Sequence, residues 1–483
     1  MIVSLYTVRV VLDVLGTEDY GIYNVIGGIV VLFSFLNTAM NGATQRFLSY
    51  ALGKMENELY QKTFSMSVNC HAVLSGGIFI LLETVGLWFL CTHMNIPDGR
   101  MVAAHWVYQF SVFSFVVNVL RVPYNASIIS YEKMSFYAYL SIIDVLLNLG
   151  VVFFLLIDAS IDKLILYSGL KFLISVFCWL ASYIYCKRVF NTCNYTFLWD
   201  KEMFKKLFGF SGWSILGAGS VLITQNGSNI LINIFCGVTA NAAYGIANQV
   251  SSAIYAFVSN FQLAFQPQIV KLYAANHREE QVLLVNRASI ISYFLLLIIS
   301  IPFILNADFV LGLWLKDVPQ YAVEFCQWML VYSLIDSIQA PLWMTINATG
   351  KIKTYSVWTS VIYLLNMPIA WVLLYLGVSP ISVFVIRVLL NLITAFIRII
   401  YIKSAFDFPI SGYIFMLFKR AVPVTVLAVG TSCYINSFTS DTSMSIVIAT
   451  ISILLITGLF EFFMGLTSNE RKFIVQLLRR KKS

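Results

Sequence analysis

Long apolar runs separated by short polar segments recur along the whole chain. A helix needs about 20 apolar residues to cross a bilayer, and thirteen runs reach or approach that length. These predicted spans lie near residues 22–48, 64–91, 102–125, 135–157, 162–186, 209–235, 239–267, 285–307, 321–347, 354–376, 379–402, 420–438 and 443–466. The pattern predicts an all-α polytopic membrane protein.

The first apolar segment, residues 1–15, is too short to span a membrane and contains Arg9 and Asp13. It has no small-residue cleavage site of the kind that ends a signal peptide. We interpret it as the second half of a first span that begins upstream, so that the expected total is about fourteen transmembrane helices.

Composition excludes an ordinary soluble enzyme. Of the 483 residues, 59% are apolar and only 11% are charged, whereas soluble proteins carry about 25% charged residues. The eight cysteines form no Cys-x-x-Cys pair, and the four histidines form no His-Glu-x-x-His. No metal or other cofactor is therefore expected.

The positive charges lie mainly in alternate loops. Of the 31 Lys and Arg residues, 24 fall in the even-numbered loops and the C-terminal tail, and 3 fall in the odd-numbered loops. Cytoplasmic loops carry such an excess, which predicts that both termini are cytoplasmic. The same distribution accounts for the net charge of +8 without nucleic acid as a partner.

Two halves of the chain repeat each other in the same orientation. The motif at Tyr20-Gly21-Ile22 recurs at Tyr244-Gly245-Ile246, and Lys171 recurs as Arg387. Further matches at a constant offset are Pro123, Lys133, Tyr137, Leu146, Leu147 and Asn148 with Pro341, Lys351, Tyr355, Leu364, Leu365 and Asn366. Parallel repeats of this kind occur in secondary transporters around a central cavity.

The repeat predicts four parts of the chain. They are an N-terminal six-helix lobe (1–190), a basic cytoplasmic linker (191–208), a C-terminal six-helix lobe (209–403), and two extra helices with a basic tail (404–483).

Four cations lie within or near the ends of predicted spans. A charged side chain costs about 2.5–3.5 kcal/mol in the bilayer centre, so it usually faces a protein interior or water. Arg9, Arg46, Lys171 and Arg387 are therefore candidate residues for binding an anionic substrate, and the arginine fork suits phosphate. Snorkelling or a structural ion pair is the alternative, and Asp13 is a partner for Arg9.

A polar stripe runs along the predicted span 239–267, which is the eighth when the partial N-terminal span is counted as the first. Asn248, Ser252, Tyr255, Ser259, Gln262 and Gln266 follow one another at intervals of three and four residues. That spacing places them on one helix face. Four of them, Asn248, Ser252, Gln262 and Gln266, are candidates for hydrogen bonds to sugar hydroxyls. The same side chains also suit hydrogen bonds between helices.

Acids within predicted spans are candidates for coupling to an ion gradient. Asp144 lies midway along the predicted span 135–157, and Asp336 lies midway along the predicted span 321–347. An intramembrane carboxylate carries H⁺ or Na⁺, or pairs with a nearby cation. Both acids are retained as candidates for H⁺ or Na⁺ coupling.

Two stretches, residues 4–53 and 247–274, resemble bacterial O-antigen and oligosaccharide flippases of the multidrug/oligosaccharidyl-lipid/polysaccharide exporter (MOP) superfamily. The resemblance implies two lobes in a V shape, with a cavity lined by the first, second, seventh and eighth spans. It places Arg9 and Arg46 on cavity-lining spans. Relatives usually complete the first span upstream, and this chain departs from them there.

The resemblance also implies a function. An undecaprenyl-pyrophosphate-linked oligosaccharide would cross the bacterial inner membrane by alternating access, without catalysis. Its partners would be the lipid-linked oligosaccharide, membrane lipids and other polysaccharide-assembly membrane proteins. The first alternative is a multidrug and toxic compound extrusion antiporter of the same fold. The second is a membrane polysaccharide polymerase or glycosyltransferase, which the short external loops disfavour.

Overall fold

The computed structural model describes residues 10–472 apart from 12–13, 17, 24, 28–33, 95, 156–161, 316, 439–442 and 469. Its described elements are all helices. The chain divides into two compact units, Met1–Ala218 and Gly219–Ser483, which are described separately here as unit 1 and unit 2.

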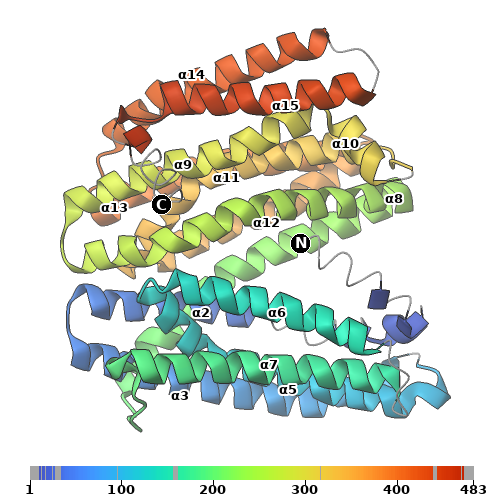
Figure 1. Ribbon diagram of the computed structural model, residues 1–483, viewed down its shortest axis with the longest axis vertical. Helices are drawn as coiled ribbons and strands as arrows, with labels where there is room; N and C mark the ends of the chain where they lie inside the picture. Colours follow the sequence, from blue (N-terminus) through green and yellow to red (C-terminus); the bar gives the residue numbers. More distant parts are fainter. Residues whose placement is uncertain are drawn as a thin grey trace, which may run out of the picture. The chain divides into compact units, whose positions relative to one another are not determined.

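Unit 1 is built around one central helix, α5. Its elements are α2 (Ser34–Gly53), α3 (Asn57–Leu81), the π-helix η1 (Leu82–Gly86), α4 (Leu87–His93), α5 (Met101–Ser130), α6 (Met134–Leu155) and α7 (Lys163–Val189). Helix α5 packs against α2, α3, α6 and α7, and α6 packs on α7 (Figure 1). The buried side chains of α5, among them Val107, Val112 and Val119, form the middle of the apolar core.

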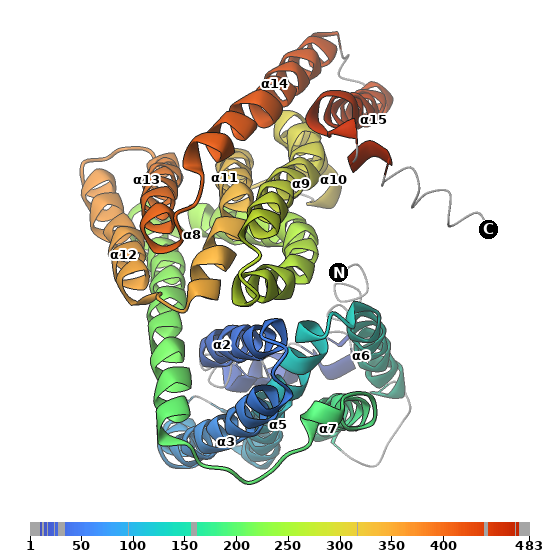
Figure 2. The ribbon, with the colours of Figure 1, turned by 90° about the vertical axis from the view of Figure 1, so that its left-hand side faces the viewer.

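Unit 2 repeats this packing order. Its elements are α8 (Lys201–Ala274, which begins in unit 1), α9 (Arg278–Leu305), α10 (Ala307–Trp314), α11 (Ala322–Thr349), α12 (Lys353–Tyr375), α13 (Ile381–Phe406), α14 (Ile410–Ser437), α15 (Ser443–Phe460) and the π-helix η4 (Glu461–Gly465). Helix α11 packs against α9 and α13, as α5 does against α3 and α7. Helices α14 and α15 pack together against α9 (Figure 2).

Eleven helices in the described residues are long and apolar enough to cross a membrane, so the chain is a multi-pass membrane protein. The number differs from the expected fourteen for three reasons. Helix α8 counts once but contains two predicted spans, 209–235 and 239–267. Helix α2 carries many polar residues and is not among the eleven. Most of residues 1–15 lies outside the described residues.

The two predicted spans within α8 meet at Gly237. This residue has φ 80° and ψ −178°, a backbone region that is essentially restricted to glycine. The helix therefore changes direction here without an intervening loop. The hydropathy pattern predicts the two spans but not their direct connection.

Gly86 ends the π-helix η1 under the Tyr108 side chain. The Tyr108 hydroxyl donates a hydrogen bond to Leu82 O at 2.6 Å, and a Cβ atom on Gly86 would overlap that hydroxyl. We expect Gly86→Ala to lower the free energy of unfolding by about 1–3 kcal/mol, the usual cost of overpacking. Adding Tyr108→Phe should recover part of this loss, because it removes the overlapping oxygen. Thermal unfolding in detergent measures both; equal stability of Gly86→Ala and wild type would contradict the packing.

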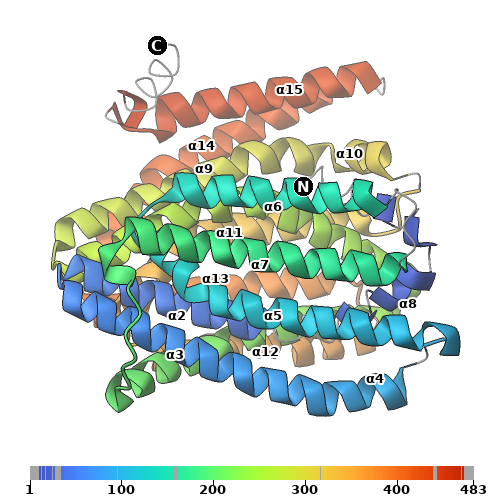
Figure 3. The same cartoon turned by 60° about the horizontal axis from the view of Figure 1, so that its bottom comes forward.

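The connection between α7 and α8 is attached to α3. Residues 190–200, called the strap here, run beside α3 to the start of α8 (Figure 3). The strap makes contacts at successive turns of α3, through Gln61–Asn194, Ser65–Thr196 and Asn69–Leu198. Residues 201–208, predicted as part of a linker, form instead the first turns of α8, and Leu207 packs on Met66 and Cys70.

Asp200 joins the strap to α8. Its carboxylate accepts hydrogen bonds from the backbone N–H groups of Glu202 and Met203, at 2.8 and 3.0 Å, and forms an ion pair with Lys62 of α3. The bond from Lys62 and those from the helix N-terminus lower the pKa of Asp200 to about 2.

This pKa predicts a pH dependence. Because the folded-state pKa lies below the unfolded value of about 3.9, the carboxylate's stabilisation is complete above about pH 4 and is lost as the pH falls towards 2. We expect Asp200→Ala to lower the melting temperature more than Asp200→Asn, which keeps the helix cap. When the pH falls from about 4 towards 2, the melting temperature should decrease less in both variants than in wild type. An identical pH profile in all three proteins would refute this assignment.

Candidate functional site

A cavity of about 350 Å³ lies inside unit 1, between α5, α6, α7 and the described residues before α2. Its lining side chains are aromatic, hydroxyl, amide and charged, with one aliphatic residue: Tyr23, Phe110, Ser111, Ser114, Phe115, Asn118, Asp144, Asn148, Ser168, Lys171, Ile174 and Ser175, together with Gly27. Its size is in the range that holds a small ligand. It is called the unit 1 pocket below.

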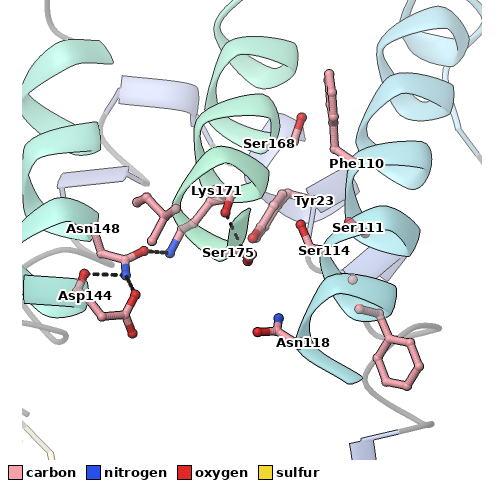
Figure 4. Close-up of a pocket in the computed structure, with 13 residues that line it drawn as sticks. Tyr23, Phe110, Ser111, Ser114, Asn118, Asp144, Asn148, Ser168, Lys171 and Ser175 are labelled. Atoms are coloured by element: carbon pink, nitrogen blue, oxygen red, sulfur yellow. Dashed lines mark hydrogen bonds between the residues drawn. The ribbon is translucent and has the colours of Figure 1, made fainter. Parts of the chain in front are cut away.

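Asn148 connects the two charged groups of this pocket. Its side-chain N–H donates to Asp144 Oδ1 at 3.1 Å, and its side-chain oxygen accepts a hydrogen bond from Lys171 Nζ. Asp144 and Asn148 are one turn apart on α6, and Lys171 projects from α7 (Figure 4). The Asn148 amide thus joins the Asp144 carboxylate and the Lys171 amine in one hydrogen-bond network, in which it lies between the two charged groups.

The opposite wall is formed by α5. Figure 4 shows Ser111, Ser114 and Asn118 of α5 across the pocket from Asp144 and Lys171. Hydroxyl and amide groups are able both to donate and to accept hydrogen bonds. The pocket therefore combines one acid, one base and neutral polar groups with the aromatic faces of Tyr23 and Phe110.

Unit 2 has a related but nearly closed cavity. This unit 2 pocket, about 20 Å³, has room for about one water molecule. It is lined by Val221, Thr224, Tyr332, Tyr363, Asn366, Arg387 and Leu390. The Arg387 guanidinium lies 4.6 Å from the centre of the Tyr332 ring.

The internal repeat relates the two pockets. Asn148 and Lys171 of the unit 1 pocket correspond in the repeat to Asn366 and Arg387 of the unit 2 pocket. The acids do not correspond: Asp336 of α11 aligns with Asn118, and Asp144 aligns with Ile362. Each unit thus pairs an amide with a cation, but only the unit 1 pocket also has a lining carboxylate.

Asp336 lies in a buried polar cluster of unit 2. Tyr255 of α8 donates a hydrogen bond to Asp336 Oδ2 at 2.8 Å. Asp336 also attracts Arg398 electrostatically, and Arg398 Nε donates to the Tyr355 hydroxyl at 2.8 Å. Arg398 is one of the 24 cations assigned from the sequence to the even-numbered loops and the C-terminal tail. This assignment is wrong, because Arg398 lies inside α13 and is only 4% exposed.

The polar stripe of α8 mainly contacts other helical segments of unit 2. Asn248 accepts a hydrogen bond from Gln225, and Gln262 is buried and donates to Ser337 O at 3.2 Å. Ser252 is exposed and Gln266 is half-buried. Neither pocket is lined by Asn248, Ser252, Gln262 or Gln266. Their role in substrate binding stays a prediction.

The predicted cation Arg46 does not line the unit 1 pocket. Arg46 is 8% exposed, and its guanidinium packs against the rings of Phe47, Tyr50 and Phe210 at 4.5–5.6 Å. Arg9 lies outside the described residues. Sequence reasoning did not select Ser111, Ser114 or Asn118, although an i, i+3, i+7 spacing of polar residues was visible in that span.

The chain resembles a family model and several solved structures of MATE and MOP superfamily transporters. The MatE family model matches residues 218–372. A structure described as the outward-facing conformation of a multidrug resistance MATE family transporter of the MOP superfamily is 14% identical, with a TM-score of 0.70, covering 85% of this chain and 92% of the other. A second, "MATE in the straight conformation", is 15% identical with a TM-score of 0.67, covering 84% and 96%.

A third similar structure is described as a MOP superfamily transporter from Pyrococcus furiosus with a reverse polarity of the binding pocket. It is 14% identical, with a TM-score of 0.66, covering 84% of this chain and 96% of the other. No curated protein matches the chain.

These comparisons and the membrane spans define the class: the chain is a multi-pass membrane protein with a MATE-like fold. Part of the chain, residues 218–372, matches the MatE family model, and the fold is shared with structures described as MOP superfamily transporters. The substrate is a separate question, for which the family-model match and the similar structures favour the multidrug extrusion alternative over the flippase.

Proposed function

We propose that the chain is an ion-coupled exporter of the MATE type, which moves an amphiphilic organic molecule out of the cytoplasm in exchange for H⁺ or Na⁺. The observation that carries the proposal is the Asp144–Asn148–Lys171 network in the unit 1 pocket. The MatE match and the similar structures support the transporter class independently of this network.

In this proposal Asp144 is the ion-binding group. It is the carboxylate of the unit 1 pocket, and Cys178 lies 3.9 Å from its Oδ1. Asn148 holds Lys171 near Asp144, and the two charges attract each other. A proton or Na⁺ on Asp144 would reduce this attraction. Lys171 would then be released to an alternative partner, so ion binding changes the charge that the pocket presents to a substrate.

A flippase of lipid-linked oligosaccharide is the second candidate, and the repeated cation favours it. Lys171 and Arg387 occupy corresponding places in the repeat, and each lines a pocket. Cations suit a pyrophosphate group, and the hydroxyl and amide groups on α5 suit sugar hydroxyls. This candidate retains the bacterial inner membrane, the lipid-linked oligosaccharide and other polysaccharide-assembly proteins as proposed location and partners.

Two deletion hosts distinguish the candidates. We would express the chain in one bacterium without its own multidrug exporters and in another without its own O-antigen flippase. The MATE-type proposal predicts higher resistance to organic cations and dyes in the first host, and no surface polysaccharide in the second. Restored polysaccharide without drug resistance would overturn the first proposal in favour of the flippase. Membrane insertion is checked in both hosts by an epitope on the chain.

A further inference from the structure

The unit 2 pocket is enclosed by helices that hydrogen bonds and packing hold together. The Thr224 hydroxyl of α8 donates to Tyr363 O of α12 at 2.8 Å. One turn further along α8, Ser228 donates to the side-chain oxygen of Asn366 at 3.0 Å. Helix α13, which carries Arg387, packs against both α11 and α12. The pocket is therefore part of the packed interior of unit 2.

Three polar side chains of this pocket keep a hydrogen-bond donor that is not used. The hydroxyls of Tyr332 and Tyr363 have no acceptor among the described residues. The Asn366 side-chain oxygen faces Ser228, and its nitrogen donates one N–H to Val383 O at 3.5 Å, which leaves the second N–H. Together with Arg387, the lining thus offers several donors and a cation but no carboxylate.

The cation of the unit 2 pocket lacks the counter-charge that its counterpart in unit 1 has. Arg387 lies against the Tyr332 ring and forms no ion pair with a carboxylate of the described residues. In unit 1 the corresponding residue is Lys171, and Asp144 lines the same pocket. The repeat places Ile362, a buried apolar residue, at the position of Asp144. Unit 1 therefore supplies an anion from its own chain, and unit 2 does not.

The interior of unit 2 has an excess of positive charge. Away from their first and last turns, α11, α12 and α13 contain three charged residues, Asp336, Arg387 and Arg398. Asp336 accepts the hydrogen bond from Tyr255 and does not line the pocket. One carboxylate balances only one of the two arginines. Because an unbalanced charge is costly inside a membrane protein, a bound anion would stabilise this interior.

We propose that the unit 2 pocket binds a monatomic anion, held between the Arg387 guanidinium and the hydroxyls of Tyr332 and Tyr363. Its volume of about 20 Å³ suits an ion not much larger than water and is too small for phosphate or sulfate. Chloride is the abundant ion of this class in cells. The site goes beyond the proposed function, in which Asp144 of the unit 1 pocket binds the coupling cation.

Thermal unfolding of the purified full-length chain in detergent tests the proposal. Sodium chloride would replace sodium gluconate stepwise at constant ionic strength. We expect the melting temperature to rise saturably with chloride, by about 2–4 °C. Bromide should replace chloride, whereas sulfate and phosphate should not. A rise that does not saturate, or that sulfate produces equally, is a general salt effect and would overturn the proposal. Stabilisation by phosphate but not by chloride would also overturn it.

Matched variants locate the ion. Arg387→Gln should abolish the response to chloride, whereas Lys171→Gln, at the corresponding position of unit 1, should keep it. Tyr363→Phe removes one donor and little volume, so the chloride concentration for half the effect should rise about tenfold. This variant decides the matter even if Arg387→Gln does not fold. The proposal is wrong if either variant of the unit 2 pocket responds as wild type does, or if Lys171→Gln loses the response.

Discussion

Asp144→Asn should reduce ion-driven transport at least about tenfold, which corresponds to roughly 1.4 kcal/mol in the transport barrier. The substitution is nearly isosteric, and its amide oxygen still accepts the hydrogen bond from Asn148 at the position of Asp144 Oδ1. The amide, however, carries no charge and binds no exchangeable proton in the physiological range. The pocket therefore keeps its shape and loses the carboxylate that we propose binds the ion. Uptake into vesicles under an imposed H⁺ or Na⁺ gradient measures the effect.

An exposed aspartate provides the matched control for this variant. Asp308 lies on the short helix α10 and lines neither pocket, so Asp308→Asn should transport at the wild-type rate. Equal transport by Asp144→Asn and Asp308→Asn would exclude Asp144 as the coupling group. Lys171→Gln provides a second test, because it removes the cation but leaves the acid free to bind the ion.

Arg398→Met should lower the free energy of unfolding by about 1–3 kcal/mol, the cost of leaving a buried hydrogen-bonding group without its partner. The methionine fills a similar volume but donates nothing to the Tyr355 hydroxyl. It also leaves Asp336 without the attraction of its buried cation. Thermal and denaturant unfolding in detergent, followed by tryptophan fluorescence, gives the change.

The partner and an exposed arginine are the controls for this second prediction. Adding Asp336→Asn should restore part of the loss, because it removes the charge that Arg398→Met leaves uncompensated. Arg188→Met, at an exposed position near the end of α7, should change stability by no more than about 0.5 kcal/mol. A comparable small change for Arg398→Met would show that the buried cluster is not stabilising.

Most helix positions follow from hydropathy, because the length of an apolar run limits the length of the helix. The predicted span 135–157 corresponds to α6 (Met134–Leu155), and 162–186 corresponds to α7 (Lys163–Val189). The exceptions are places where helix continues through polar or flexible residues. Helix α14 begins at Ile410 and not near 420, because the amphipathic stretch before the apolar run is also helical.

The candidate site follows from the sequence only residue by residue. Intramembrane charge identifies Asp144 and Lys171 separately, since burying a charge is costly wherever it lies in a span. Their connection through Asn148 depends on how α6 and α7 are rotated against each other. Neither helix sequence contains that information, because many apolar residues on both helices would pack equally well.

The stripe on α8 shows a second limit of sequence reasoning. Its spacing places the polar residues on one helix face. Such a face suits either a polar cavity or hydrogen bonds to a neighbouring helix, so the spacing does not distinguish them. Tyr255 and Gln262 contact α11, through Asp336 and the Ser337 carbonyl oxygen. Only the tertiary packing distinguishes the two environments.

Gradient-driven transport by the purified chain tests the central claim most directly. Proteoliposomes containing wild type, Asp144→Asn or Asp308→Asn would receive a fluorescent organic cation, and an H⁺ or Na⁺ gradient would then be imposed. The account predicts that the gradient drives accumulation by wild type and Asp308→Asn, that an ionophore abolishes it, and that Asp144→Asn shows none. Accumulation that is independent of both gradients, or equal in wild type and Asp144→Asn, would contradict the account.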